Sequence, residues 1–208
     1  MNQTLVNEIV RKVVEVIKER QAIPVEVSAR HVHLSQQHIE ILFGNDYKMT
    51  KKKDLSQLGQ FQCNERVTLI GPKGVIQGVA ILGPARHKTQ VEISKTDARV
   101  LGVDPPVRES GQLDGSASLY IATEKAVIEA RGSVIVAKRH IHMTPEDAKN
   151  FNVHDKQIVS VRVKGDRTVV FEDVVVRVSS HFKLNMHIDF DEANAAGCRT
   201  GAVGEIIG

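Results

Sequence analysis

The chain has 208 residues, of which 41% are hydrophobic and only 4% aromatic, with no tryptophan. Its net charge of +3 comes without an arginine-rich segment, which argues against a nucleic-acid-binding protein. No apolar run approaches the roughly 18 residues needed to span a membrane, and two cysteines are too few for a disulfide framework. We therefore expect a cytoplasmic protein whose core consists of Val, Ile and Leu, a composition that favours strands.

The N-terminal segment, residues 1–22, is predicted to form an amphipathic helix. Within residues 4–20 apolar positions recur at helical spacing with charged residues between them, and Pro24 follows the segment. Two interpretations stay open. The helix packs on its own domain or on a dimer partner, or it is a peptide that docks on another protein through its apolar face.

From Ile23 onward the pattern changes to short strands, several of them separated by turn sequences at 71–74 and 164–167. The predicted strands cover residues 25–29, 67–70, 75–76, 79–82, 133–137, 159–163 and 174–178. Many short strands with brief helices between them, repeated in two halves, predict a mainly β fold of two adjoining small β-barrels.

Short helices are predicted to cap these barrels. Ser35 and Thr144 are N-cap residues for two of them. Two more, at 97–101 and 192–196, are each followed directly by a glycine, Gly102 or Gly197, which is typical of a helix C-terminus.

The domain boundaries follow from the spacing of the repeat. We assign residues 30–110 to the first barrel and residues 133–208 to the second, with a linker region at 111–132. Residues 44–64 contain three consecutive lysines and few apolar positions, so they are predicted to be an insertion in the first barrel.

The internal repeat carries the chemistry. Arg-His-x-His occurs at residues 30–33 and again at 139–142, and a second pair of similar segments begins at Glu92 and His187. Residues i and i+2 of a strand point to the same side, so both histidines of each motif can bind one ion. Glu92 and His187 each stand between a predicted strand and a helix, where a third ligand can be supplied.

Each half therefore predicts a three-ligand metal site. The first consists of His31, His33 and Glu92, and the second of His140, His142 and His187. Three N/O ligands leave one coordination position open, as in catalytic zinc sites, although Co, Fe or Ni would also suit these donors. With Zn²⁺, the two-histidine, one-carboxylate site keeps a single positive charge, so it suits a thiolate. The three-histidine site keeps both charges and should hold an anion such as phosphate better.

Arg86 lies six residues before Glu92. An arginine side chain can bind phosphate through two parallel hydrogen bonds. Its position alone is equally consistent with a surface charge.

Five segments together resemble one known family. They read SARHVHL (28–34), LGPAR (82–86), QVEISKTDAR (90–99), RHIHM (139–143) and MHIDFDEANA (186–195). These segments are similar to those of the PduL-type phosphate propanoyltransferases, a family of phosphotransacylases, and the resemblance extends from about Ile23 to Val203. It implies two adjoining β-barrels, with the first strand, residues 23–29, exchanged into the second barrel.

The resemblance also implies ligands for the two sites. Two zinc ions per chain are implied, with the coenzyme A sulfur completing the first site and phosphate the second. Arg86 is implied as the phosphate-binding and catalytic residue. The positions implied to contact coenzyme A are Val27, Ser28, Ala29, Lys53, Lys73, Leu82 and Asn194. The chain departs from the family at Ala29, where Asn is frequent, and at Ala80, where a basic residue is frequent.

The activity implied is acyl-CoA + phosphate ⇌ acyl phosphate + CoA, with propanoyl-CoA as in propanediol degradation, while acetyl and butanoyl groups stay open. A homodimer is expected. Residues 4–20 resemble the extension that directs many family members into a bacterial microcompartment, which implies shell or lumen proteins as partners. Two alternatives also stay open: a dinuclear zinc hydrolase of thioesters or phosphoesters, and a non-catalytic module associated with a microcompartment.

Overall fold

The computed structural model describes residues 6–8, 11, 22–199 and 201–207. Of the predicted N-terminal helix, Val6–Glu8 and Arg11 are helical, and the rest of residues 1–21 lies outside the described residues. Most of residues 4–20, for which a docking role is predicted, therefore lie outside the described residues. Within the part of the chain that the structure describes, no helix has the length and apolarity to cross a membrane.

The fold is mainly β and contains two β-barrels, as predicted, and each barrel is closed by six strands. The strands of the first barrel are β2 (His31–His33), β4 (Phe61–Ile70), β5 (Val75–Gly83), β6 (Gln90–Glu92), β8 (Ala117–Ala122) and β9 (Val127–Ala137). Those of the second are β1 (Ile23–Ser28), β10 (His140–Met143), β11 (Ile158–Lys164), β12 (Val169–Val178), β13 (Asn185–Asp189) and β14 (Val203–Ile207). Two short strands, β3 (Lys51–Asp54) and β7 (Val107–Arg108), extend the first barrel beside β4 and β9.

The two barrels share one topology, which is the structural form of the sequence repeat. The strand of the first motif, β2, pairs in parallel with β5 and antiparallel with β6. The strand of the second motif, β10, pairs in the same way with β12 and β13. The repeat therefore extends beyond the motifs to the strand neighbours of each histidine pair.

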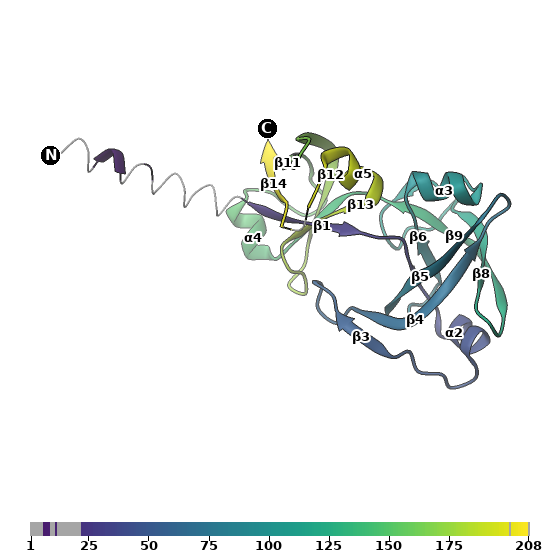
Figure 1. Cartoon of the computed structure of the whole chain (residues 1–208). Helices are drawn as coiled ribbons and strands as arrows, with labels where there is room; N and C mark the ends of the chain where they lie inside the picture. The colour runs from purple at the N-terminus through teal and green to yellow at the C-terminus, as the bar shows by residue number, and fades with distance from the viewer. Residues whose placement is uncertain (1–5, 9–10, 12–21, 200, 208) are drawn as a thin grey trace.

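The barrels exchange strands in both directions. The N-terminal strand β1 directly precedes β2 in the chain, yet it pairs with β13 and β14 of the second barrel. Conversely, β9 directly precedes β10 but pairs with β6 and β8 of the first barrel. In Figure 1 the purple β1 accordingly lies among the yellow and green C-terminal strands. Each Arg-His-x-His motif therefore follows a strand that belongs to the opposite barrel.

This exchange changes the expected boundaries. Residues 111–132, expected as a linker, contain β8 and the beginning of β9, and residues 133–137, expected in the second barrel, are the rest of β9 in the first. The reason is burial: Leu119 and Ile121 of β8 pack in the first core, and β8 pairs with both β4 and β9 to close the barrel. The insertion at 44–64 contains β3 and the first residues of β4.

Among residues 22–199, four short helices cap the barrels: α2 (Gln36–Phe43), α3 (Lys95–Leu101), α4 (Pro145–Asn150) and α5 (Phe190–Ala196). The predicted N-caps Ser35 and Thr144 accept hydrogen bonds from the backbone of their helices. Gly102 and Gly197 end α3 and α5 in the left-handed conformation, with φ of 74° and 60°. The capping predictions are therefore confirmed, although α3 and α5 each begin two residues earlier than predicted.

The arginine of each motif is anchored to the helix that follows the third candidate ligand. Arg30 binds both carboxylate oxygens of Asp97 in α3, at 2.9 and 2.8 Å. Arg139 binds Glu192 in α5 at 2.8 Å. Asp97 and Glu192 occupy the same position in their helices, where each also completes a capping box. These ion pairs link each histidine motif to the segment that carries its third ligand.

Substituting Arg30 by methionine should lower the free energy of unfolding by about 2 kcal/mol, because Asp97 would remain buried without its partner. Arg131→Met is the matched control, since the Arg131–Glu129 pair is exposed, and it should leave the free energy of unfolding almost unchanged. Urea unfolding of both variants measures the difference. Equal destabilisation by the two substitutions would contradict this role for the Arg30–Asp97 pair.

Candidate metal centres and their shared cavity

The first candidate metal site lies at the junction of β2 and β6. His31 and His33 are two residues apart on β2, and the antiparallel register places Glu92 of β6 directly opposite His31. One ligand atom from each of the three side chains lies within 4.8 Å of the other two. All three residues are buried. The predicted first triad is therefore brought together in a geometry that fits one ion.

The second candidate site repeats this arrangement in the other barrel. His140 and His142 lie on β10, and the antiparallel register places His187 of β13 directly opposite His140. The ligand atoms of these three side chains also lie within 4.8 Å of one another. The register offset between motif and third ligand is thus identical in the two barrels.

Backbone carbonyl groups select the tautomer of the leading histidine at each site. His31 Nδ1 lies 2.8 Å from the carbonyl oxygen of Ala29, and His140 Nδ1 lies 2.9 Å from that of Lys138. A carbonyl only accepts, so Nδ1 carries the proton and Nε2 presents its lone pair. Hydrogen bonds of this kind orient metal-binding histidines. Both triads therefore fit a bound divalent metal ion.

His31 and Glu92 of the first triad shift each other's pKa in opposite directions. Burial would by itself lower the pKa of His31, but the carboxylate of Glu92, 3.5 Å away, raises it above its ordinary value. Burial would likewise raise the pKa of Glu92, but His31 and His33 hold it well below its usual range. Glu92 is thus held as the carboxylate that a metal ion requires.

The second triad has no acid of its own and remains neutral. Burial, together with the neighbouring imidazoles, lowers the pKa of His140 to about 4 and that of His142 to about 2. Burial also lowers the pKa of His187 to about 4. Neutral imidazole is the form that binds metals, so these three side chains are in the ligand state at neutral pH.

Two residues that the sequence did not single out hold the carboxylate of Glu92. Ser110 donates a hydrogen bond from its hydroxyl to Glu92 Oε1 at 2.9 Å, and the Gln90 amide donates to the same oxygen. Oε2 is left to face His31. Ser110 lies in a polar loop without a repeated motif, so no signal in the sequence pointed to it.

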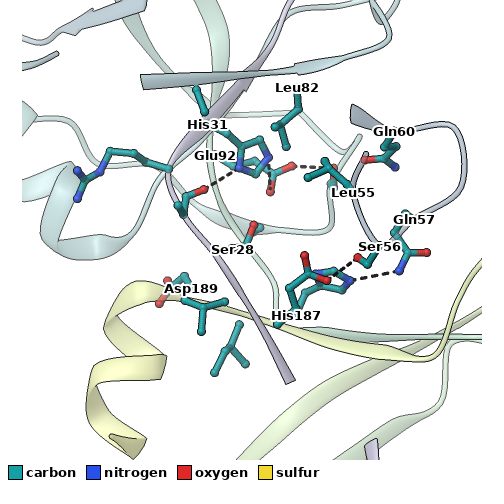
Figure 2. A pocket seen from close by; sticks show the side chains of 18 of the residues that line it. Ser28, His31, Leu55, Ser56, Gln57, Gln60, Leu82, Glu92, His187 and Asp189 are labelled. Carbon is teal, nitrogen blue, oxygen red and sulfur yellow. Dashed lines mark hydrogen bonds and ion pairs between the residues drawn. The ribbon is translucent and has the colours of Figure 1, made fainter. Parts of the chain in front are cut away.

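Both triads open into one cavity of about 430 Å³ between the barrels, and all six candidate ligands line it. Figure 2 shows His31 and Glu92 across this pocket from His187, with the loop from Leu55 to Gln60 along one side. A substrate in the cavity can therefore reach both sites at once.

Two arginines line the cavity. Arg86, predicted from the sequence, donates a hydrogen bond to Ser110 at 3.2 Å. Burial lowers the pKa of the Arg86 guanidinium, Glu92 partly offsets that shift, and the charge of Arg177 adds to it. Arg177 was missed by sequence reasoning. It lies beside His142 in the parallel register of β10 and β12, which the sequence alone does not reveal.

Most positions expected to contact coenzyme A line the same cavity, and two do not. Those in the lining are Val27, Ser28, Ala29, Lys53 and Leu82, and Ala80 is there as well. Lys73 lies instead in the turn between β4 and β5, where its side chain packs beside Gly102. Asn194 is exposed on α5.

Comparison with known proteins identifies the family. A family model described as phosphate propanoyltransferase matches residues 24–199. The chain belongs to the phosphate propanoyltransferase family. A protein with that name from Clostridioides difficile is 53% identical over 99% of this chain and 98% of its own. One from Enterococcus faecalis is 54% identical over 97% of this chain and 96% of its own. A third, from Thermotoga maritima, is 49% identical over 95% of both chains.

Ser110→Ala should weaken metal binding at the first site of this family member about tenfold, because Glu92 loses a hydrogen bond that orients it. Ser116→Ala is the control, since the buried Ser116 hydroxyl has no hydrogen-bond partner. Titration of both variants with Co²⁺, followed by its visible absorption, measures the affinity of each site. Unchanged affinity in Ser110→Ala would contradict the proposed support of Glu92.

Proposed function

We propose that the chain transfers a short acyl group, with propanoyl as the expected one, between coenzyme A and phosphate. The reaction is acyl-CoA + phosphate ⇌ acyl phosphate + CoA. The observation that carries this proposal is the shared cavity, because two sites of different charge face one volume where both substrates can meet. Bringing the two reactants together in a defined orientation lowers the entropic part of the barrier.

Zinc is the proposed metal at both sites, since histidine and carboxylate donors in sets of three suit Zn²⁺ with one open position. The proposed ligands are His31, His33 and Glu92 at the first site and His140, His142 and His187 at the second. Zinc bound there would supply Lewis acidity that favours a thiolate at one site and an anionic oxygen at the other.

The two arginines are proposed to bind phosphate. Arg86 and Arg177 both line the cavity, and the effect of Arg177 on the pKa of Arg86 reflects their proximity. Two positive charges in a cavity that the neutral histidines of the second triad also line attract an anion, and each guanidinium can donate paired hydrogen bonds to phosphate oxygens. Phosphate held in this way directs one oxygen at the thioester carbonyl.

The proposed transfer is direct. A phosphate oxygen attacks the carbonyl carbon, a C–O bond forms, the C–S bond breaks, and the sulfur leaves with its electron pair as a thiolate. No cysteine takes part, because neither Cys63 nor Cys198 lines the cavity. Burial also raises the pKa of the Cys63 thiol to about 11, which leaves it protonated and a poor nucleophile.

Coenzyme A is proposed to enter along β1, where Val27, Ser28 and Ala29 line the cavity, and past Lys53 and Leu82 on the other wall. Lys73 and Asn194 lie outside the lining, so any contact they make is with a part of the cofactor that extends beyond the cavity. The homodimer and the microcompartment location remain predictions.

Purified protein should contain two zinc ions per chain and should release thiol from propanoyl-CoA only when phosphate is present. Thiol release with and without phosphate, with elemental analysis of the same sample, tests this. Removal of the metal by a chelator should abolish activity, and added Zn²⁺ should restore it. Thiol release that does not need phosphate would instead support the hydrolase alternative.

Arg86→Lys should raise the KM for phosphate about tenfold with little change in the KM for propanoyl-CoA, because lysine keeps the charge but cannot form the paired hydrogen bonds. Arg99→Lys, an exposed change on α3, is the matched control. Steady-state kinetics with each substrate varied in turn separates the two constants. An effect confined to propanoyl-CoA would contradict the role assigned to Arg86.

A further inference from the structure

The loop between β3 and β4, residues 55–60, belongs to the first barrel but contacts the second. Its backbone is closed by hydrogen bonds from Leu55 N to Gln60 O at 3.0 Å and from Gln60 N to Gln57 O at 3.1 Å. Ser56 donates a hydrogen bond to Glu26 of β1, the residue paired with His187 across the β1–β13 ladder. The loop lies within the insertion at 44–64, so the internal repeat offers no counterpart for it.

Gln57 is a buried residue of this loop and is held by two hydrogen bonds to Lys183. The residue is 5% exposed and lines the cavity. Its amide nitrogen donates to the carbonyl oxygen of Lys183 at 3.2 Å, and its amide oxygen accepts from the Lys183 backbone nitrogen at 3.3 Å. Reversing the amide would face donor to donor and acceptor to acceptor, so the two bonds determine its orientation.

This orientation directs an N–H group at the second metal site. The Gln57 amide nitrogen carries two hydrogens, only one of which is used by Lys183, and it lies 3.5 Å from His187 Nε2 (Figure 2). An N–H facing Nε2 disfavours a proton on that ring nitrogen, so Nε2 presents its lone pair. A nitrogen that binds a metal ion cannot also accept a hydrogen bond, and the second amide N–H is then free for whatever else occupies the site.

We propose that Gln57 is a substrate-binding residue, whose free amide N–H donates a hydrogen bond to a phosphate oxygen held at the His140, His142 and His187 site. The inference rests on the proposed function and adds a neutral donor to the two arginines. A buried, oriented amide suits an anion, because hydrogen bonds to charged acceptors are stronger than those between neutral groups.

The test is phosphate binding, measured by calorimetry on the zinc-loaded protein without acyl-CoA. Gln57→Met has a similar size but no donor, and it should weaken phosphate binding about tenfold or more. Gln57→Glu keeps an acceptor for Lys183 N and adds a negative charge, so it should weaken phosphate binding as well. Both variants should still bind two zinc ions per chain and should unfold cooperatively on heating, which shows that they are folded.

Gln60→Leu is the matched control, because Gln60 lies in the same loop and lines the same cavity. Its phosphate affinity should stay within about twofold of the wild type. Unchanged phosphate affinity in both Gln57 variants would overturn the inference. Loss of one zinc ion from both Gln57 variants would also overturn it, because Gln57 would then be a residue that orients His187. A rise in the KM for propanoyl-CoA alone would overturn it as well. Wild-type protein that binds no phosphate would instead refute the proposed function itself.

Discussion

The antiparallel register of two short strand pairs is the constraint on which the candidate active site depends. His31 stands opposite Glu92, and His140 stands opposite His187. A shift of one residue in either pairing would turn the third ligand to the other face of its strand and disperse the triad. The core opposes such a shift, because the residues between the histidines, Val32 and Ile141, are completely buried. The same packing that stabilises each barrel thus determines the ligand geometry.

The exchange of β1 and β9 explains why two sites in separate barrels share one cavity. Each motif begins where the chain leaves one barrel and enters the other, so both histidine pairs lie at the junction of the barrels. The Arg30–Asp97 and Arg139–Glu192 pairs fix the motifs to helices that meet at this junction, where the Thr96 backbone donates to Asp191. An internal repeat without strand exchange would give two similar sites without this shared volume.

The sequence predicted features that depend on local patterns, namely several of the strands, the helix caps, two turns and the residues that form the two triads. Features that depend on contacts between residues distant in the chain were not predicted. Residues 111–137 were divided wrongly because strand neighbours, not chain order, determine the barrel to which a strand belongs. Arg177 reaches the cavity only through its register beside His142, and Ser110 and Gln57 lie in polar loops whose composition carries no motif. The internal repeat therefore predicted site residues at positions where the two halves agree, and it predicted none where the halves differ.

Those differences give the two candidate sites different charges and different polar neighbours. Glu92 brings a carboxylate to the first site, and the donors around it, Ser110 and Gln90, come from the first half alone. At the second site His187 keeps the ligand set neutral, and the nearby polar groups are a guanidinium and an amide, Arg177 and Gln57. Hydrogen-bond donors that bind the Glu92 carboxylate are not available to a substrate. Hydrogen-bond donors that face the open cavity can bind an incoming anion. One geometry repeated with two sets of neighbours therefore suits the proposed reaction, in which a sulfur leaves on one side and an oxyanion attacks from the other.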